Sequence, residues 1–333
     1  MTKKTMDKST QPETAAPRRK HLLTRFLAWE GSGALVALVA LVVLLSFLSA
    51  NFLSQYNLSV VARQASFVGL IALGQTLVLL IGGIDLSLGA AAGLSAIFGS
   101  ILLTQTSIHP YAVLPITMAF GAFLGSLNGV FVAWLRLNPF IVTLASWEIF
   151  AGTTLVITKG YPIRPLGEEF RVFGQGTVFG LPVPVLIFLG VGLVLAIVMA
   201  RTRFGRNIYA VGGNRDAAEL VGIRSWRVEF IVFCIAGMLA ALAGILYASR
   251  MDSGQPSVGE GWLMGSITAA IIGGTSLKGG QGAVTGTVLG ALFMAVLANG
   301  IVLLSISGYW ERVIIGSVVL IAILLDLLRR QRH

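Results

Sequence analysis

The sequence predicts an all-α membrane protein whose helices cross the bilayer many times. Hydrophobic residues make up 56% of its 333 residues and charged residues only 11%, so too few polar side chains are present to cover a soluble globule. The hydrophobic residues occur as long, nearly uncharged runs that are separated by short polar or glycine-rich stretches. Runs of this length and composition are typical of successive transmembrane helices.

About ten such runs follow one another, so we expect residues 1–30 to form a basic tail and residues 31–329 to form one transmembrane domain. The first run, 33–53, is too long for a cleaved signal peptide and is followed by no A-x-A cleavage site. The further spans are predicted at 58–82, 85–104, 110–135, 140–158, 181–200, 226–249, 262–277, 282–305 and 309–328. Near Gly83 and Gly279, a break within one membrane segment is an alternative to a turn between two spans.

The basic residues predict the orientation of these spans. If both termini are cytoplasmic, 18 of the 24 Lys and Arg residues fall on the inner side, as the positive-inside rule requires. The longest inner connector is then 201–226. The longest outer loop is 159–180, where Pro162, Pro165 and several glycines are expected to prevent a helix.

Several classes of function are excluded by what the sequence lacks. The net charge of +10 does not indicate nucleic-acid binding, because the charges flank hydrophobic runs instead of forming a basic face. The single cysteine, Cys234, permits no intrachain disulfide, and no cluster of metal ligands is expected. The dipeptide Gly-Lys never occurs, so the chain has no Walker A motif and is not itself a P-loop ATPase. We expect it to hold no cofactor and no metal.

The connector 201–226 is the one long polar segment between hydrophobic runs, and its centre, 214–222, predicts a short helix. Asn214 can cap the amino end of this helix and Gly222 can end it. Asp216 and Glu219 favour its first turns because acidic side chains stabilise that end of a helix. An amphipathic helix in this place can serve as a handle for a soluble partner, and an ordinary connector is the alternative.

Glycines interrupt the hydrophobic pattern twice, in the similar stretches 81–89 (IGGIDLSLG) and 272–282 (IGGTSLKGGQG). Adjacent glycines destabilise a continuous helix, and the freed backbone groups then need protein or water partners. Such interruptions mark binding sites or gates in transporters, whereas a plain cytoplasmic turn is the alternative. The paired glycines at the start of the two breaks are Gly82, Gly83, Gly273 and Gly274.

Other glycines recur every four residues, which predicts helices that pack closely. The rows are Gly121, Gly125 and Gly129; Gly282, Gly286 and Gly290; and the shorter Gly89 and Gly93. Packing within one subunit is the expected use of these rows, and a seam between two copies is the alternative.

These motifs resemble those of the ribose-type (pentose and hexose) sugar permeases of ABC importers, within the branched-chain amino acid/sugar permease superfamily. The first break is similar to the family's GGIDLS(V/L)G, and the second to its LGGTSLxGGxG. Asp216-Ala217-Ala218 followed by Gly222 is similar to the E-A-A-x-x-x-G coupling loop, with Asp in place of Glu. The outer segment 252–261 fits the family only loosely. The resemblance extends from about residue 55 to the end.

The resemblance implies a type II-like permease fold in a bacterial cytoplasmic (inner) membrane, with two permease copies, identical or different, forming one passage. It also implies that ATPase subunits hydrolyse ATP and that an external solute-binding protein delivers a monosaccharide such as ribose, xylose or another pentose or hexose. The 159–180 loop is the expected surface for that binding protein. The residues implied in ATPase coupling are Asn214, Asp216, Ala217, Ala218, Glu219 and Gly222.

Few polar groups lie in the predicted spans, and they complete the candidate pathway formed by the paired glycines. Glu148 can accept hydrogen bonds from sugar hydroxyls and Trp147 can stack on a sugar ring; a structural glutamate is the alternative. Asp85 can cap the helix after the first break. Asn128 and Asn299 can line a neutral passage or hold helices together.

Two classes of rival function remain at this point. One is an ABC permease for another small solute, such as a branched-chain amino acid, a nucleoside or a signalling sugar. The other is a proton-coupled secondary transporter, in which Glu148 or Asp85 would carry the proton. A membrane scaffold without transport activity is less consistent with the glycine breaks.

Overall fold

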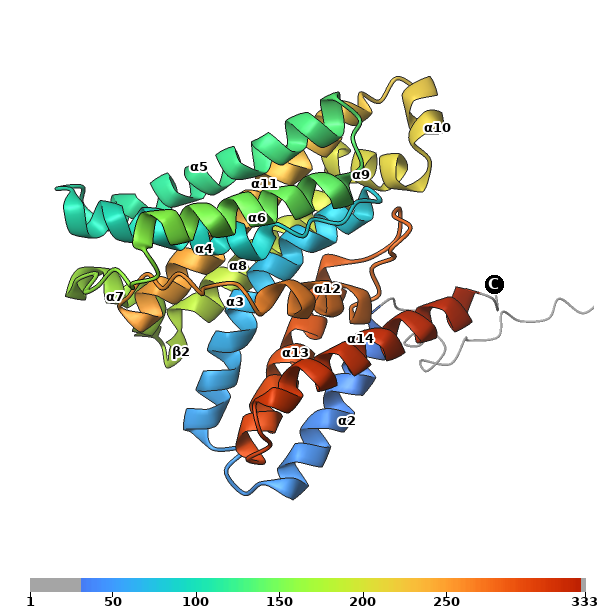
Figure 1. The fold of residues 1–333 in the computed structure, drawn as a ribbon. Helices are drawn as coiled ribbons and strands as arrows, with labels where there is room; N and C mark the ends of the chain where they lie inside the picture. The colour runs from blue at the N-terminus through green and yellow to red at the C-terminus, as the bar shows by residue number, and fades with distance from the viewer. Residues whose placement is uncertain (1–30, 331–333) are drawn as a thin grey trace, which may run out of the picture.

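The computed structural model describes residues 31–330, so the expected basic tail, 1–30, lies outside the described residues (Figure 1). Within this part of the chain nearly all regular structure is helical. The only strands there are β1 (Thr177–Val178) and β2 (Leu181–Pro182), which pair as a short antiparallel hairpin. The predicted all-α class is therefore confirmed.

A helix occupies each of the ten predicted spans. Seven of these helical stretches are long and apolar enough to cross a membrane, which confirms a multi-pass membrane protein. The helices are α2 (Ser32–Leu48), α3 (Gln55–Leu80), α4 (Leu88–Gln105), α5 (Pro110–Gly129), α6 (Pro139–Thr158), α8 (Val183–Arg201), α11 (Ser225–Met251), α12 (Trp262–Ile272), α13 (Val284–Leu303) and α14 (Tyr309–Arg330). A short π-helix, η1 (Val130–Trp134), extends α5.

The segment predicted to span at 262–277 is shorter than a full crossing. Helix α12 has 11 residues, and at about 1.5 Å of rise per residue it covers roughly half of a hydrocarbon core about 30 Å thick. The chain is then non-helical from 273 to 283, just as it is from 81 to 87 between α3 and α4. Both glycine-rich stretches therefore interrupt helical structure over several residues.

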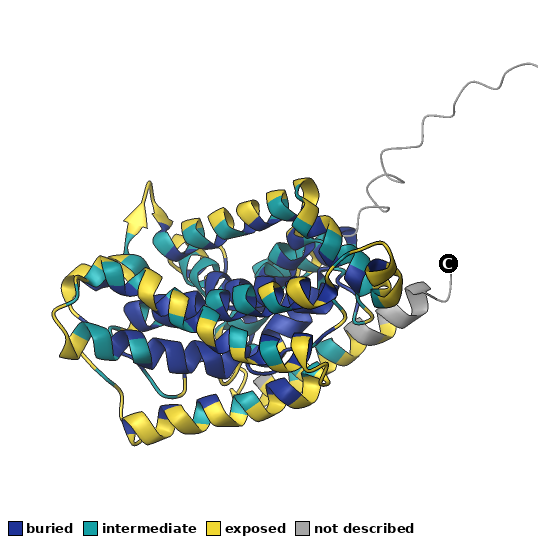
Figure 2. Cartoon of the chain, turned by 90° about the horizontal axis from the view of Figure 1, so that it is seen from above, coloured by how far each residue is buried: buried dark blue, intermediate teal, exposed yellow. Residues whose placement is uncertain are grey.

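Helix α3 is the centre of the bundle. In its most apolar window 89% of the residues are buried, against 22% in α6 and 28% in α8. Helix α11 packs along α3, α4 and α5, and α13 packs against α2, α3 and α12. Figure 2 shows the buried residues gathered along the inside of the bundle and the exposed ones around its periphery. The helices α6 and α8 are thus peripheral, where a lipid or a second copy can reach them.

The first glycine row joins α5 to α11 within the chain. A Cβ added at Gly121 would meet the Gly237 carbonyl, and one added at Gly125 would meet the Phe233 carbonyl. Two helix backbones are therefore in direct contact, as small residues permit in membranes. The predicted close packing is confirmed for this row.

The other rows also serve packing within the chain. Added Cβ atoms at Gly286 and Gly290 of α13 would meet the backbone of α12 and of Gly273, which follows it. Those at Gly89 and Gly93 of α4 would meet carbonyls of the 252–261 segment. Gly282 lies before α13, in the non-helical stretch, and packs against Thr275. The expected packing within one subunit is thus found for the helical glycines of every row.

The prediction that the outer loop 159–180 contains no helix is wrong. Helix α7 (Glu168–Gln175) forms after the second proline, with two glutamates in its first turn, where acidic side chains are stabilised by the helix dipole. Phe170 is fully buried in a cluster with Ile245 and Val258. This burial stabilises a helix whose short local sequence gives little signal of its own.

Candidate functional site

Helices α9 (Arg203–Gly213) and α10 (Arg215–Leu220) form one end of the molecule, and α7 with the β1–β2 hairpin lies at the other (Figure 1). We call these the α10 end and the α7 end. The short helix predicted at 214–222 is present as α10. The Asn214 side chain caps it by accepting from the Ala217 N–H at 2.9 Å. Gly222 ends the turn with a φ of +85°, a conformation that glycine adopts without strain.

Helix α10 presents an apolar tip on an otherwise polar connector. Ala218 is buried and anchors the helix, whereas Ala217 is exposed. The next two apolar residues, Leu220 and Val221, are 88% and 76% exposed. An exposed pair of large aliphatic side chains on a polar segment is typical of a contact with another protein. The sequence analysis selected the helix but missed these two residues. Two large apolar residues directly before the glycine that ends the helix were the signal that could have indicated them.

Ion pairs hold α10 against the membrane helices. The Arg215 guanidinium lies 3.1 Å from the carboxylate of Glu229 in α11 and 3.3 Å from that of Glu219. Glu219 also lies 3.7 Å from Arg136, which follows η1. Glu229 is almost completely buried, so its pairing with Arg215 matters far more than the exposed pairs. Sequence reasoning missed Glu229 because it lies within a predicted span.

Replacing Arg215 with alanine is expected to destabilise the α10 end. Without Arg215, Glu229 becomes a buried carboxylate that has lost its ion pair, and losses of this kind cost on the order of 3 kcal/mol. Arg136→Ala is the matched control, because it removes only an exposed contact at 3.7 Å. Thermal unfolding of the purified protein in detergent checks this. Equal melting temperatures for the two variants would contradict the prediction.

The two glycine breaks meet each other and α9 at the α10 end. The Gly280 N–H donates to the Leu80 carbonyl at 2.9 Å, and the Tyr209 hydroxyl donates to the Gly282 carbonyl at 2.8 Å. A Cβ added at Gly212 would overlap the Leu80 carbonyl. We call this three-way backbone contact the glycine junction. It connects α9, and through it α10, to both interrupted membrane segments.

The predicted gate glycines divide between two places. Gly82 has a φ of +82°, and its backbone nitrogen would lie 2.9 Å from a Cβ added at Gly279, so it belongs to the glycine junction. Gly83 follows it and packs near Val78. Gly273 packs instead against Gly286 at the start of α13, and Gly274 follows with a φ of +92°.

Asp85 and Asn128 form a buried polar link between helices. The Asp85 carboxylate accepts from the Ser87 N–H and hydroxyl at 2.7 and 2.6 Å, just before α4 begins. The Asn128 amide of α5 donates to the Ser87 hydroxyl at 2.8 Å, and its oxygen accepts from Ser146 of α6. These bonds fix the first break against its neighbours, and the second carboxylate oxygen of Asp85, Oδ2, is buried without a hydrogen-bond partner among the described residues.

The other polar candidates lie elsewhere. Trp147 packs against the main core, while Glu148 is exposed on the peripheral helix α6. Asn299 of α13 exchanges two amide hydrogen bonds with Asn57 of α3, at 2.8 and 3.0 Å. Within one chain these three residues therefore do not come together at a common site.

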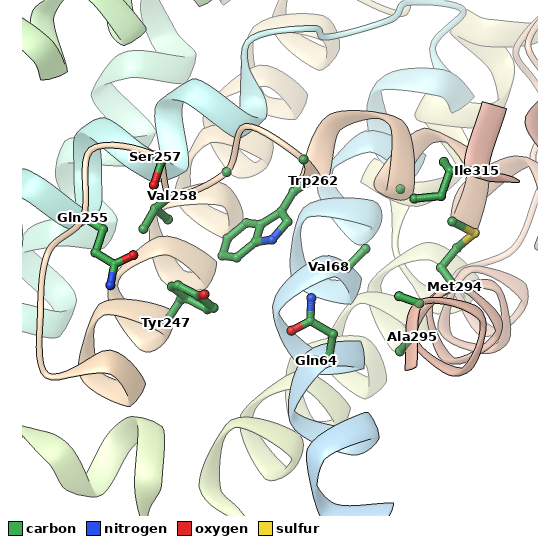
Figure 3. Close-up of a pocket in the computed structure, with 14 residues that line it drawn as sticks. Gln64, Val68, Tyr247, Gln255, Ser257, Val258, Trp262, Met294, Ala295 and Ile315 are labelled. Carbon is green, nitrogen blue, oxygen red and sulfur yellow. The ribbon is translucent and has the colours of Figure 1, made fainter. Parts of the chain in front are cut away.

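A cavity of about 200 Å³ lies between α3, α11, α12, α13, α14 and the 252–261 segment (Figure 3). Its polar lining comes from the side chains of Gln64, Tyr247, Gln255, Ser257 and Trp262. Gln64 follows Arg63, whose guanidinium donates to the Gln175 carbonyl at the end of α7, so Gln64 lies close to the α7 end. Sequence reasoning did not select these residues.

The α7 end is held together by an ion pair on its surface. The Arg171 guanidinium donates to the Asp252 carboxylate at 2.8 Å, and this hydrogen bond together with the Asp252 charge raises the pKa of Arg171. Asp252 also accepts from the Leu166 N–H at 3.0 Å. Beyond this pair, Phe179 at the tip of the β1–β2 hairpin is fully exposed.

Comparison with known proteins agrees with this architecture. The family model described as "Branched-chain amino acid transport system / permease component" matches residues 57–324. The ribose import permease protein RbsC of Bacillus subtilis is 40% identical over 88% of this chain and 92% of its own length. The D-allose transport system permease protein AlsC of Escherichia coli is 36% identical over 90% and 92%.

A third relative, the autoinducer 2 import system permease protein LsrC of Photorhabdus luminescens, is 34% identical over 88% of both chains. The family match covers most of the chain, including both glycine breaks, α9, α10 and the cavity. The resemblance inferred from the sequence motifs is thereby confirmed, and the chain belongs to the family of branched-chain amino acid transport system permease components.

Proposed function

We propose that the chain is the membrane-spanning subunit of an ABC importer for a monosaccharide. In this assembly two permease copies form the passage, partner ATPases hydrolyse ATP, and an external binding protein delivers the sugar. Relatives named for ribose and D-allose import support a pentose or hexose as cargo. Because another relative is named for autoinducer 2 import, a signalling sugar is the alternative cargo.

The observation that carries this proposal is the apolar tip of α10. Leu220 and Val221 are largely exposed, although they lie on an arginine-rich connector and not on a membrane span. Burying two such side chains in a partner's groove contributes several kcal/mol, at about 1.5–3 kcal/mol each. A cytoplasmic ATPase is the partner that the family relationship supports, and we therefore assign the α10 end and both termini to the cytoplasm.

The glycine junction supplies a route from that contact to the passage. A displacement of α10 acts on α9 directly, and α9 meets both interrupted segments through backbone contacts with Leu80 and with residues 279–280. Where two backbones are in direct contact, no side chain can change rotamer to absorb a displacement, so movement of one segment moves the other. We therefore assign the two breaks the role of gate elements that ATP-driven motion of α10 repositions.

The α7 end is the surface that we assign to the solute-binding protein. It carries α7, the Arg171–Asp252 pair and the exposed Phe179 tip of the hairpin. An exposed aromatic side chain is a common element of protein interfaces. The peripheral helices α6 and α8 then face lipid or the second permease copy, and Glu148 lies among them.

Transport in proteoliposomes tests the proposal. The chain is co-expressed with its genomic partner ATPase and binding protein, purified as a complex and reconstituted. Uptake of radiolabelled D-ribose, D-allose or D-xylose is expected only with ATP and the binding protein, and a proton gradient without ATP is expected to drive none. Vigorous uptake without the ATPase would instead identify a secondary transporter.

A further inference from the structure

We propose that the cavity between α3, α11, α12 and α13 is a binding site for a neutral, polyhydroxylated solute inside the permease itself. This inference rests on the proposed transport function. It goes beyond that function because it identifies a binding site for the transported solute within the membrane domain. At about 200 Å³, the space holds a small organic molecule and is much larger than a single water requires.

The lining excludes a charged ligand. None of the fourteen residues that line the cavity is acidic or basic. Moving an ion from water into such a site without an opposite charge is very costly. A neutral solute with many hydroxyl groups avoids this cost if the site offers hydrogen-bonding groups in return.

Such groups are present and unused. The side chains of Gln64, Gln255 and Ser257 make no hydrogen bond with any described residue, and the two amides are half-buried at the cavity. A half-buried amide without a protein partner is available to a solute, and each glutamine side chain offers both a donor NH₂ and an acceptor oxygen. This combination suits a hydroxyl group, which both donates and accepts.

An aromatic wall completes the site. The Trp262 ring is held by a parallel contact with Phe67, at 6.3 Å between centroids, and by an edge contact with Tyr247, at 5.1 Å. Figure 3 shows it between Gln255 and Tyr247 on one side and Gln64 and Val68 on the other. A fixed aromatic face attracts the C–H face of a sugar ring, while the amides bind its hydroxyl groups.

The rest of the lining is mostly apolar and includes Val68, Met294, Ala298 and Ile315. Apolar groups of this kind make no directed contact with a hydroxyl group, so only the two amides, Ser257 and the aromatic rings bind the sugar. Weak binding of this sort suits a passage, because a solute that must leave again cannot be held on all sides.

Thiol protection tests the site directly. Because Cys234 is the only cysteine, Cys234→Ala combined with Ala298→Cys places a single thiol at the cavity wall. In the reconstituted complex, D-ribose, D-allose or D-xylose at millimolar concentration is expected to slow maleimide labelling several-fold, whereas ribose 5-phosphate is not. The inference is overturned if no neutral sugar slows labelling, or if the phosphorylated sugar does so equally.

Transport by cavity variants gives an independent readout. Gln64→Leu with Gln255→Leu is expected to lower ATP-driven uptake roughly fivefold or more, as loss of neutral hydrogen bonds to the solute predicts, while ATPase activity stimulated by the binding protein persists. Gln105→Leu, at an exposed glutamine at the end of α4, is the matched control. Uptake equal to that of the control would overturn the inference. Absence of ATP-driven uptake in the unmutated complex would instead refute the proposed function, and thiol protection would still decide the site.

Discussion

Leu220→Asp is expected to abolish sugar uptake while leaving the protein folded in the membrane. Leu220 is 88% exposed, so the substitution removes no contact within the chain. In the proposed assembly the same side chain would be buried against the ATPase, where a carboxylate would have to be desolvated. Loss of about 1.5–3 kcal/mol of apolar burial alone corresponds to roughly a ten- to hundredfold weaker association.

The measurement combines co-purification of the ATPase, uptake in proteoliposomes and thermal unfolding of the isolated permease. Leu220→Met is the matched control, because it keeps a large apolar side chain at the same place and is expected to retain most of the activity. A Leu220→Asp protein that still binds the ATPase and transports sugar would show that α10 is an ordinary connector.

Gly212→Val is expected to disrupt the glycine junction. The new Cβ would overlap the Leu80 carbonyl and lie 2.8 Å from the Gly280 nitrogen. These neighbours are backbone atoms and cannot rotate away, so the overlap must separate α9 from the breaks or distort both segments. Overpacking of this kind costs about 1–3 kcal/mol or more. We expect a lower melting temperature and a loss of uptake of at least about tenfold.

The adjacent glycine provides the control for this experiment. A Cβ added at Gly213 meets no atom within 4 Å, so Gly213→Val introduces the same side chain one position further along the chain without a clash. Thermal unfolding and ATP-driven uptake are measured for both variants. If Gly212→Val behaves like Gly213→Val, the breaks are not in backbone contact with α9 and the proposed route of coupling is wrong.

The local features of this protein were predictable because neighbouring residues produce them. Long hydrophobic runs specify membrane helices wherever they occur, and the bounds of α5 with η1, and of α6, agree closely with the predicted spans. The capped helix α10 depends on Asn214 and Gly222, which lie in the same short stretch as the helix itself. The packing of glycine rows was predictable because four-residue spacing places small residues on one helix face.

Other features depend on partners that are distant in the chain. Helix α7 was missed because its stability comes from burying Phe170 against Ile245 and Val258. Glu229 looked like part of a plain span because its partner, Arg215, lies on another helix. Asn128 and Asn299 were ambiguous until the structure paired them with Ser87 and Asn57.

The sequence by itself determined the class of protein, the order of its helices and the presence of two glycine breaks, because hydrophobic runs and helix-ending residues act locally. Only the tertiary structure decided that the breaks meet at Leu80 and Gly280, some 200 residues apart, and that unpaired amides face one cavity. Contacts of that kind follow from how helices pack around α3, and packing depends on side chains from the whole chain at once.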